Sequence, residues 1–142
     1  MSAKHWFSGS YQEARKRFLD SIEELRKKGF EVSQEQLPLN LKGPQDEDLI
    51  IDLAVVGSLE SENLLLYSSG IHGVEGYPGS AIQLAIMDDL AAKDSFTDYA
   101  VVFIHSVNPF GMAWWRRFNE SNVDLNRNFL RLDEKYEGVP EG

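Results

Sequence analysis

The chain contains 142 residues, with 14 Lys and Arg against 23 Asp and Glu, a formal net charge of −9, and no cysteine. It therefore cannot form disulfides, thiolate zinc sites or a cysteine nucleophile, and its acidic balance argues against nucleic acid as the main partner. No segment approaches the roughly 18 apolar residues that a membrane span needs, and residues 1–10 contain no apolar signal-peptide core. We expect one cytoplasmic domain over residues 1–142, with neither nucleic acid nor membrane as a partner.

A helix is predicted to begin directly after Ser10. Ser10 and Glu13 fit the S-x-x-E capping box, in which side-chain oxygens accept hydrogen bonds from backbone N–H groups at the start of the helix. Gly29 is expected to end the helix, because glycine adopts the left-handed conformation at little cost. The helix would carry one apolar packing stripe, formed by Tyr11, Ala14, Phe18, Ile22 and Leu25.

Two segments in the first half of the chain are predicted to be strands around a loop. Residues 30–37 show weak alternation, residues 38–48 contain two prolines and a glycine and indicate a loop, and residues 49–56 form a convincing strand. Residues 64–67 are a short, continuous apolar run. Such a run is typical of a central strand that is covered on both faces.

A glycine-rich segment and a helix separate this run from the next strand. Residues 68–79 form the predicted loop, residues 80–93 the helix and residues 99–104 the strand, followed by a turn-rich loop over residues 105–111. The helix is expected to place its apolar residues on one side, at Ile82, Ala85, Ile86 and Leu90. This β-α-β order predicts an α/β sheet whose ligand site lies at the carboxyl ends of the strands.

The glycine-rich loop favours metal binding over phosphate binding. Its glycines recur at every third residue, so the G-x-G-x-x-G pattern is not met, and no lysine occupies the P-loop position. His72 and Glu75 are three residues apart and would lie on the same side of one turn. An imidazole nitrogen and a carboxylate both bind Zn²⁺, although a His-x-x-Glu pair also arises by chance.

A second group of polar residues follows in residues 117–129. Arg117 and Arg127 present planar guanidinium groups suited to a carboxylate, and Asn126 can add a directed amide donor. With Arg116 and Arg131 they form a basic cluster in an otherwise acidic chain. The alternative interpretation is a solvated arginine patch that pairs with the many acids.

Three motifs occur in one order: His72-x-x-Glu75, Asn108-Pro109-x-Gly111, and Arg117 nine residues before Asn126-Arg127. Together they resemble the zinc carboxypeptidase (carboxypeptidase A-like) family of metallopeptidases. The similarity extends from about residue 49 to residue 129 and is strongest to a little-characterised bacterial branch. That branch shares the wording His-Gly-Val-Glu-Gly and Val-Asp-Leu-Asn-Arg-Asn-Phe.

The resemblance implies a three-layer α/β sandwich around a mixed, partly parallel sheet, and zinc-dependent hydrolysis of an amide bond next to a free carboxylate. His72 and Glu75 would be two of three protein ligands to Zn²⁺, and Asp124 would orient the metal-binding histidine. Arg117 would polarise the scissile carbonyl and stabilise the oxyanion. Asn126 and Arg127 would bind the terminal carboxylate of the substrate.

The chain also departs from the family pattern. Phe110 stands where many relatives have Asp, and Val74 where classical carboxypeptidases often have Arg. The family's last zinc-binding His and catalytic Glu lie well beyond the Asn-Arg pair, whereas no His follows Phe129. His105 could substitute as a ligand, although a strand-end histidine whose hydrogen bonds are satisfied is the simpler interpretation.

These departures imply an N-terminal part of such an enzyme, with its sheet truncated at the C-terminal side and an edge prone to pairing with another chain. We expect the 142-residue chain alone to bind zinc weakly and to hydrolyse little or nothing. A tight, stoichiometric calorimetric titration would contradict this expectation.

Three functions remain open from the sequence. The first is a metallocarboxypeptidase-like hydrolase acting on peptides. The second is a zinc deacylase of the aspartoacylase and succinylglutamate desuccinylase kind, acting on N-acyl amino acids. Those relatives usually place Arg seven residues before the Asn, where this chain has Asn119, so the spacing favours the peptidase. The third is a non-catalytic fragment that binds carboxylates.

Overall fold

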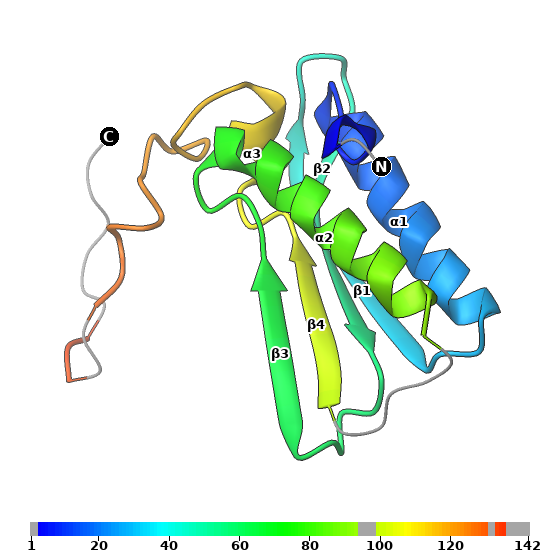
Figure 1. The fold of residues 1–142 in the computed structure, drawn as a ribbon. Coiled ribbons are helices and arrows are strands. Elements are labelled where there is room, and N and C mark those ends of the chain that lie inside the picture. The colour runs from blue at the N-terminus through cyan, green and yellow to red at the C-terminus, as the bar shows by residue number, and fades with distance from the viewer. Residues whose placement is uncertain (1–2, 94–98, 131–132, 136–142) are drawn as a thin grey trace.

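The computed structural model describes residues 3–93, 99–130 and 133–135, and Figure 1 shows the arrangement of their helices and strands. The elements in chain order are η1 (Ala3–His5), α1 (Tyr11–Lys27), β1 (Val32–Lys42), β2 (Asp48–Val56), β3 (Asn63–Ser68), η2 (Gly73–Glu75), α2 (Gly76–Ala91), β4 (Tyr99–His105) and α3 (Pro109–Ala113). The sheet has the order β1-β2-β4-β3, with antiparallel β1/β2 and β2/β4 pairs and a parallel β3/β4 pair. The predicted α/β class with a mixed, partly parallel sheet is therefore confirmed.

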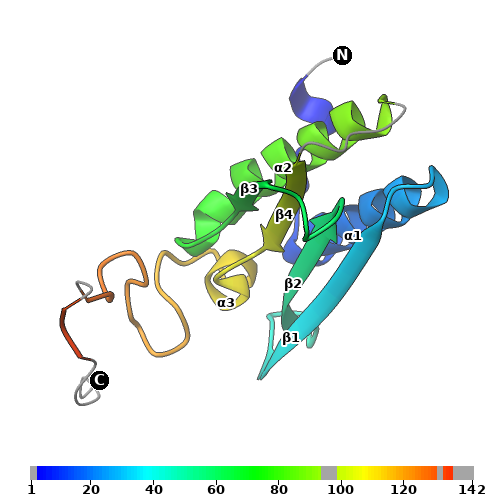
Figure 2. The same ribbon diagram turned by 90° about the horizontal axis from the view of Figure 1, so that it is seen from below.

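Helices α1 and α2 contact each other and cover one face of the sheet, as Figures 1 and 2 show. Between these helices and the sheet lies the main core, made of Phe18, Ile22, Leu25, Ala54, Val56, Met87, Leu90, Val101 and Phe103. A smaller cluster joins α3 to the starts of α1 and α2 through Tyr11, Tyr77 and Met112. Two of the three predicted layers are thus formed by the described residues. None of the helices in these residues is long and apolar enough for a bilayer crossing.

Helix α1 begins and ends where the sequence predicts. Ser10 is its N-cap, and the hydroxyl of Ser10 accepts a 3.1 Å hydrogen bond from the amide of Glu13. The return bond of the box is displaced by one residue, because the Glu13 carboxylate accepts from the amide of Gly9 at 2.7 Å. Gly29 has φ = +92°, the left-handed conformation expected after the helix. The capping chemistry therefore fixes where α1 enters and leaves the core.

Two strands differ from the sequence predictions. Strand β1 continues through Pro38, which was expected in a loop, because an edge strand tolerates a residue without an N–H and the register shifts directly after it. Strand β3 was expected to be central and covered on both faces. It lies instead at the other edge of the sheet, and Leu64, Leu65 and Leu66 are exposed by 52%, 44% and 58%.

The helix after the glycine-rich loop also differs from the one that the sequence predicts. Helix α2 begins at Gly76, four residues before the predicted start, so the loop is shorter than expected. Its buried face contains Ala81, Leu84, Met87 and Leu90, whereas Ile82 is 59% exposed. The predicted apolar side was therefore only partly right: Leu90 is in the main core and Ile86 packs against it, whereas Ile82 does not.

His105 is a buried core residue at the end of β4, but its predicted hydrogen bonding is only half satisfied, because Nδ1 has no partner among the described residues. Its Nε2 lies 3.1 Å from the hydroxyl of Ser80, and its ring stacks on Phe18 at 4.8 Å between centroids. Burial lowers the pKa of His105 to about 4. The ring is therefore neutral in the folded chain at neutral pH.

Acidification is expected to destabilise the chain through His105. His105 takes up a proton near pH 6.5 in the unfolded chain but only near pH 4 in the folded chain. The contribution of neutral His105 to the stability of the fold is therefore complete above pH 6.5 and is lost as the pH falls to 4. The loss is about 3 kcal/mol in the free energy of unfolding. Denaturant titrations over this pH range should show a flatter dependence in His105→Gln. The exposed His5→Gln should behave like the parent, and an unchanged slope in His105→Gln would contradict the assignment.

Candidate functional site

The short helix η2 places His72 and Glu75 next to each other. His72 is the N-cap of η2, and Glu75 is its last residue. The Nδ1 atom of His72 lies 3.0 Å from Oε1 of Glu75. The His72 side chain is 9% exposed and that of Glu75 is 64% exposed, so the pair lies at the surface with its imidazole packed inward. The predicted placement on one side of a turn is confirmed.

Close backbone packing holds η2 against α3. A Cβ atom on Gly73 would lie 1.9 Å from the carbonyl carbon of Gly111, so no larger residue fits at this crossing. The amide of Gly73 donates to the carbonyl of Arg117 at 3.2 Å. Asn108 caps α3 by accepting from the amide of Gly111 at 2.8 Å, and its Nδ2 donates to the carbonyls of Ile71 and Arg117. These contacts bring the downstream segment beside the glycine-rich loop.

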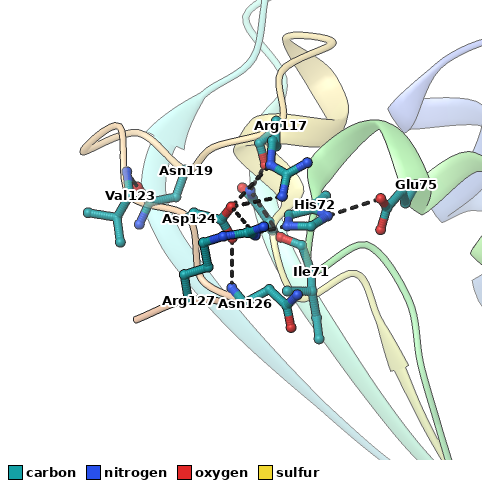
Figure 3. Close-up of polar contacts among 10 residues, drawn as sticks. Ile71, His72, Glu75, Arg117, Asn119, Val123, Asp124, Asn126 and Arg127 are labelled. Atoms are coloured by element: carbon teal, nitrogen blue, oxygen red, sulfur yellow. Dashed lines mark hydrogen bonds and ion pairs between the residues drawn. The ribbon is translucent and has the colours of Figure 1, made fainter. Parts of the chain in front are cut away.

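Asp124 is the centre of the polar network that Figure 3 shows. Its Oδ1 lies 3.0 Å from Nε2 of His72 and accepts from the amide of Asn126 at 3.0 Å. Its Oδ2 accepts from Arg117 at 3.0 Å and from Arg127 at 3.2 Å. One carboxylate therefore joins the histidine of the first motif to the arginines of the last motif.

The network shifts the protonation of its two central groups. The hydrogen bond with Glu75, and next the one with Asp124, raise the pKa of His72. Burial acts to raise the pKa of Asp124, but hydrogen bonds from His72 and Arg117 outweigh it, so the pKa is lowered. Because an ionised carboxylate only accepts, both ring nitrogens of His72 donate, Nδ1 to Glu75 and Nε2 to Asp124. The two carboxylates therefore favour the protonated imidazolium form of His72 in this metal-free arrangement.

The predicted basic cluster is only partly gathered at this site. Arg117 and Arg127 both contact Asp124 and keep 45% and 69% of their side chains exposed. Arg116 points elsewhere: it donates to Asn122 and lies over the ring of Phe110, 5.7 Å from its centroid. Arg131 lies outside the described residues. The site therefore contains two of the four arginines.

Asn119 and Asn108 are structural residues that the sequence did not assign. The side-chain oxygen of Asn119 accepts from the amides of Ser121 and Val123, at 3.1 and 2.8 Å. This turn precedes Asp124, whose carboxylate reaches His72 next to η2. Asparagine followed by turn residues was the available signal, but it does not reveal which distant segment the turn approaches.

The side chains of His72 and Glu75 fit two ligand positions of a zinc site. Two ligands at about 2.0–2.1 Å from a tetrahedral ion lie about 3.3 Å apart, close to the observed separation of the His72 and Glu75 atoms. Once the proton on Nδ1 is lost, the hydrogen bond to Asp124 would hold the remaining proton on Nε2, in the way that carboxylates support metal-binding histidines. A third protein ligand is not found: in residues 3–93, 99–130 and 133–135 no three His, Asp or Glu side chains are arranged to hold a metal.

Replacing Asp124 with asparagine is expected to weaken zinc binding by about 10- to 100-fold. The neutral amide is a weaker acceptor than the carboxylate and holds the Nε2–H group of His72 less firmly. Calorimetric titration with zinc measures the change. Asp46→Asn, in the turn between β1 and β2, removes the same charge away from the site and should leave the affinity unchanged. An equal loss in both variants would attribute the effect to net charge.

Comparison with solved structures finds distant similarity to bacterial enzymes. Tannerella forsythia glutaminyl cyclase has a TM-score of 0.45 at 14% identity, covering 82% of this chain and 48% of that one. Porphyromonas gingivalis glutaminyl cyclase has 0.40 at 12%, covering 74% and 47%. A Zn-dependent exopeptidase from Parabacteroides distasonis has 0.41 at 12%, covering 77% and 48%. The chain thus spans about half the length of these structures, and similarity at this level does not define its chemistry.

Sequence comparisons identify the family directly. The curated proteins contain no match to this sequence. Residues 7–140 match the model of a family described as "Protein of unknown function (DUF2817)". This match includes α1, all four strands and both motifs of the candidate site. The chain therefore belongs to the DUF2817 family.

Proposed function

We propose that this chain carries part of the active site of a zinc-dependent hydrolase of the metallocarboxypeptidase type. The proposed reaction cleaves an amide bond next to a free carboxylate. The observation that carries the proposal is the shared carboxylate of Asp124, which contacts both the His72 imidazole and the guanidinium groups of Arg117 and Arg127. This network places a candidate metal ligand beside candidate anion-binding groups.

His72 and Glu75 would hold the zinc ion through Nδ1 and Oε1. When bound, zinc supplies a Lewis acid that lowers the pKa of water to about 7. Asp124 would keep the proton on Nε2 of His72, so the proton that leaves when zinc binds would be the one on Nδ1, which faces Glu75. Because only two protein ligands are described, we expect the isolated chain to bind zinc weakly and to turn over little substrate.

The arginines would supply the positive charge that the substrate needs. Arg117 would stabilise the oxyanion that develops at the scissile carbonyl, and Arg127 with Asn126 would bind the terminal carboxylate. Asp124 accepts one contact from Arg127, at 3.2 Å, while more than half of that side chain remains exposed. The guanidinium can therefore be held in place and still meet a second carboxylate.

Binding and hydrolysis assays test the proposal together. An N-blocked dipeptide with a free C-terminus should bind the chain more tightly than the same dipeptide with a C-terminal amide, as measured by NMR titration. Arg127→Met should remove this preference, whereas Arg26→Met on α1 should keep it. Any zinc-stimulated cleavage should disappear in His72→Ala. Equal binding of acid and amide would contradict the proposal, and cleavage of N-acyl amino acids alone would indicate the deacylase.

A further inference from the structure

A recess with aromatic walls lies where the starts of α1 and α2, the turn between β1 and β2, and the end of α3 meet. It has a volume of about 300 Å³. Four aromatic side chains line it, those of Tyr11, Tyr77, Trp114 and Trp115. None of the described residues in its lining is Lys, Arg or His. This aromatic recess shares no residue with the polar network around Asp124.

Trp115 ends α3 in a backbone conformation that usually belongs to glycine. Its φ is +55°, in the left-handed region. The amide of Trp115 donates to the carbonyl of Met112 at 3.4 Å, and the amide of Arg116 donates to the carbonyl of Gly111 at 2.8 Å. These two bonds form the Schellman motif, in which the left-handed residue is usually glycine. A bulky side chain is a rare exception at this position, so its presence points to a role for the indole ring.

The two tryptophan rings of the recess are fixed in place. Trp115 stacks on Tyr77, with 4.4 Å between the ring centroids and 18° between the ring planes. Tyr77 is buried, and its hydroxyl donates to the carbonyl of Met112 at 3.1 Å. Trp114 donates from Nε1 to the carbonyl of Lys42 at 3.3 Å. Trp115 is nevertheless 62% exposed, so the ring face that points away from Tyr77 is open to a ligand.

Carboxylates lie close to the aromatic recess. Glu47 accepts a hydrogen bond from the amide of Gln45, and Glu13 accepts one from the amide of Gly9, both at 2.7 Å. Gln45 and Gly9 are themselves part of the lining. Burial is the main cause that raises the pKa of Tyr11 to about 12, and the charge of Glu47 adds to it. The recess therefore lies within the electrostatic reach of a carboxylate.

Two basic side chains near the recess already have acidic partners. Arg15, whose charge also acts on Tyr11, donates to Asp52 at 2.6 and 3.0 Å. The ammonium group of Lys42 lies 2.8 Å from Asp48. The net charge of −9 adds a long-range attraction for cations. Aromatic faces and negative charge together favour a cationic ligand over a neutral or an anionic one.

We propose that the aromatic recess binds an organic cation, an alkylammonium or guanidinium group, against the rings of Trp114 and Trp115. Cations are attracted to the faces of aromatic rings, and tryptophan attracts them most strongly. Lysine and arginine side chains of a peptide carry this chemistry, and so do small quaternary ammonium compounds. Their carbon atoms would pack on the rings while the charge lies near Glu13 and Glu47. This site needs neither zinc nor Arg127, so it is independent of the proposed hydrolase.

NMR titration of the indole N–H signals of the 142-residue chain tests the proposal. The first two probes are N-acetyl-lysine methylamide and N-acetyl-norleucine methylamide. They share a four-carbon side chain and differ in the ammonium group, and neither has a free carboxylate for Arg127. We expect the lysine probe to bind about tenfold more tightly and to shift the signals of Trp114 and Trp115 but not that of Trp6. N-acetyl-arginine methylamide and tetramethylammonium chloride then show which cation the recess prefers.

Two replacements of Trp115 separate binding from folding. Trp115→Gly removes the ring but supplies the residue that the left-handed position favours, so near-UV circular dichroism should still show a folded chain. Its preference for the lysine probe should fall about tenfold, whereas Trp115→Phe keeps an aromatic face and should keep most of the preference. Trp6→Leu is the control, because Trp6 donates to Asp88 at 2.7 Å in a different hollow. It should bind both probes like the parent.

A charge variant tests the role of the carboxylate. Glu47→Gln should weaken binding of the lysine probe and leave that of the norleucine probe unchanged. Glu60→Gln removes the same charge beyond the other end of β2 and should have no effect. Equal binding of the lysine and norleucine probes would overturn the proposal. A folded Trp115→Gly that keeps the preference, or an equal loss in Trp6→Leu, would overturn it as well.

Discussion

Gly73→Ala is expected to destabilise the chain strongly and to disconnect the two halves of the candidate site. The added Cβ would lie 1.9 Å from the carbonyl carbon of Gly111 and 2.3 Å from the amide nitrogen of Met112, where backbone and not a flexible side chain must move. Overpacking of this kind costs about 1–3 kcal/mol or more. We expect a loss at the upper end, measured as the free energy of unfolding in urea.

The structural consequence of Gly73→Ala should be local to the site. Gly73 bonds to Arg117 through the backbone, so moving η2 away from α3 also separates His72 from Asp124. The ring signals of His72 should therefore shift in NMR spectra. Gly9→Ala is the control, because a Cβ there meets only the far end of the Glu13 side chain at 3.5 Å. A stable Gly73→Ala with unchanged His72 signals would contradict this packing.

Asp52→Ala should produce the second large loss of stability. Asp52 is fully buried on β2, and its carboxylate accepts from Arg15 at 2.6 and 3.0 Å and from Gln36 at 2.9 Å. Burial raises the pKa of Asp52 in spite of these bonds. Removing one member of a fully buried ion pair costs about 3–5 kcal/mol, and we expect a loss near the lower end because the Arg15 side chain is 21% exposed.

Urea unfolding measures this effect against a surface pair on the same helix. Asp20 pairs with Lys16, and both side chains are more than half exposed. Asp20→Ala should therefore cost less than about 1 kcal/mol. If Asp52→Ala lowers the free energy of unfolding no more than Asp20→Ala does, the Arg15–Asp52 ion pair is not a main link between α1 and the sheet.

The sequence predicted local features of the fold better than it predicted the order of the strands across the sheet. The Ser10 cap and Gly29 could be predicted because their chemistry lies within one helical turn. The apolar run of β3 correctly indicates a strand, but apolarity on both faces does not say which neighbours a strand has. The edge position of β3 and the continuation of β1 through Pro38 both depend on pairing between distant segments.

The sequence pattern also does not determine which face of helix α2 is buried. Helix α2 has apolar residues on two sides: Leu84 and Met87 are buried, whereas Ile82 is exposed and lines an apolar groove between α2 and β3. Periodicity alone selects a side only when the opposite side is polar. The choice in α2 is made by the sheet, which the helical pattern does not contain.

In the candidate site, too, some contacts could be predicted from the sequence and others could not. The spacing of His72 and Glu75 places them on one turn, and this could be predicted from local geometry. The contact of His72 with Asp124 spans 52 positions and came only from the resemblance to a known family. Asn108 and Gly73 determine how the two segments meet, through a side-chain amide and a missing Cβ. Their roles became visible only in the packed structure.

The proposed zinc site requires His72 to bind zinc through Nδ1 while Nε2 stays bonded to Asp124. Long-range ¹H–¹⁵N NMR of the three histidine rings during a zinc titration measures this directly. We predict that Nδ1 of His72 alone responds, at millimolar rather than tight stoichiometric zinc, and that the response disappears in Glu75→Ala. A response at His5, at His105 or at Nε2 of His72 would contradict the account.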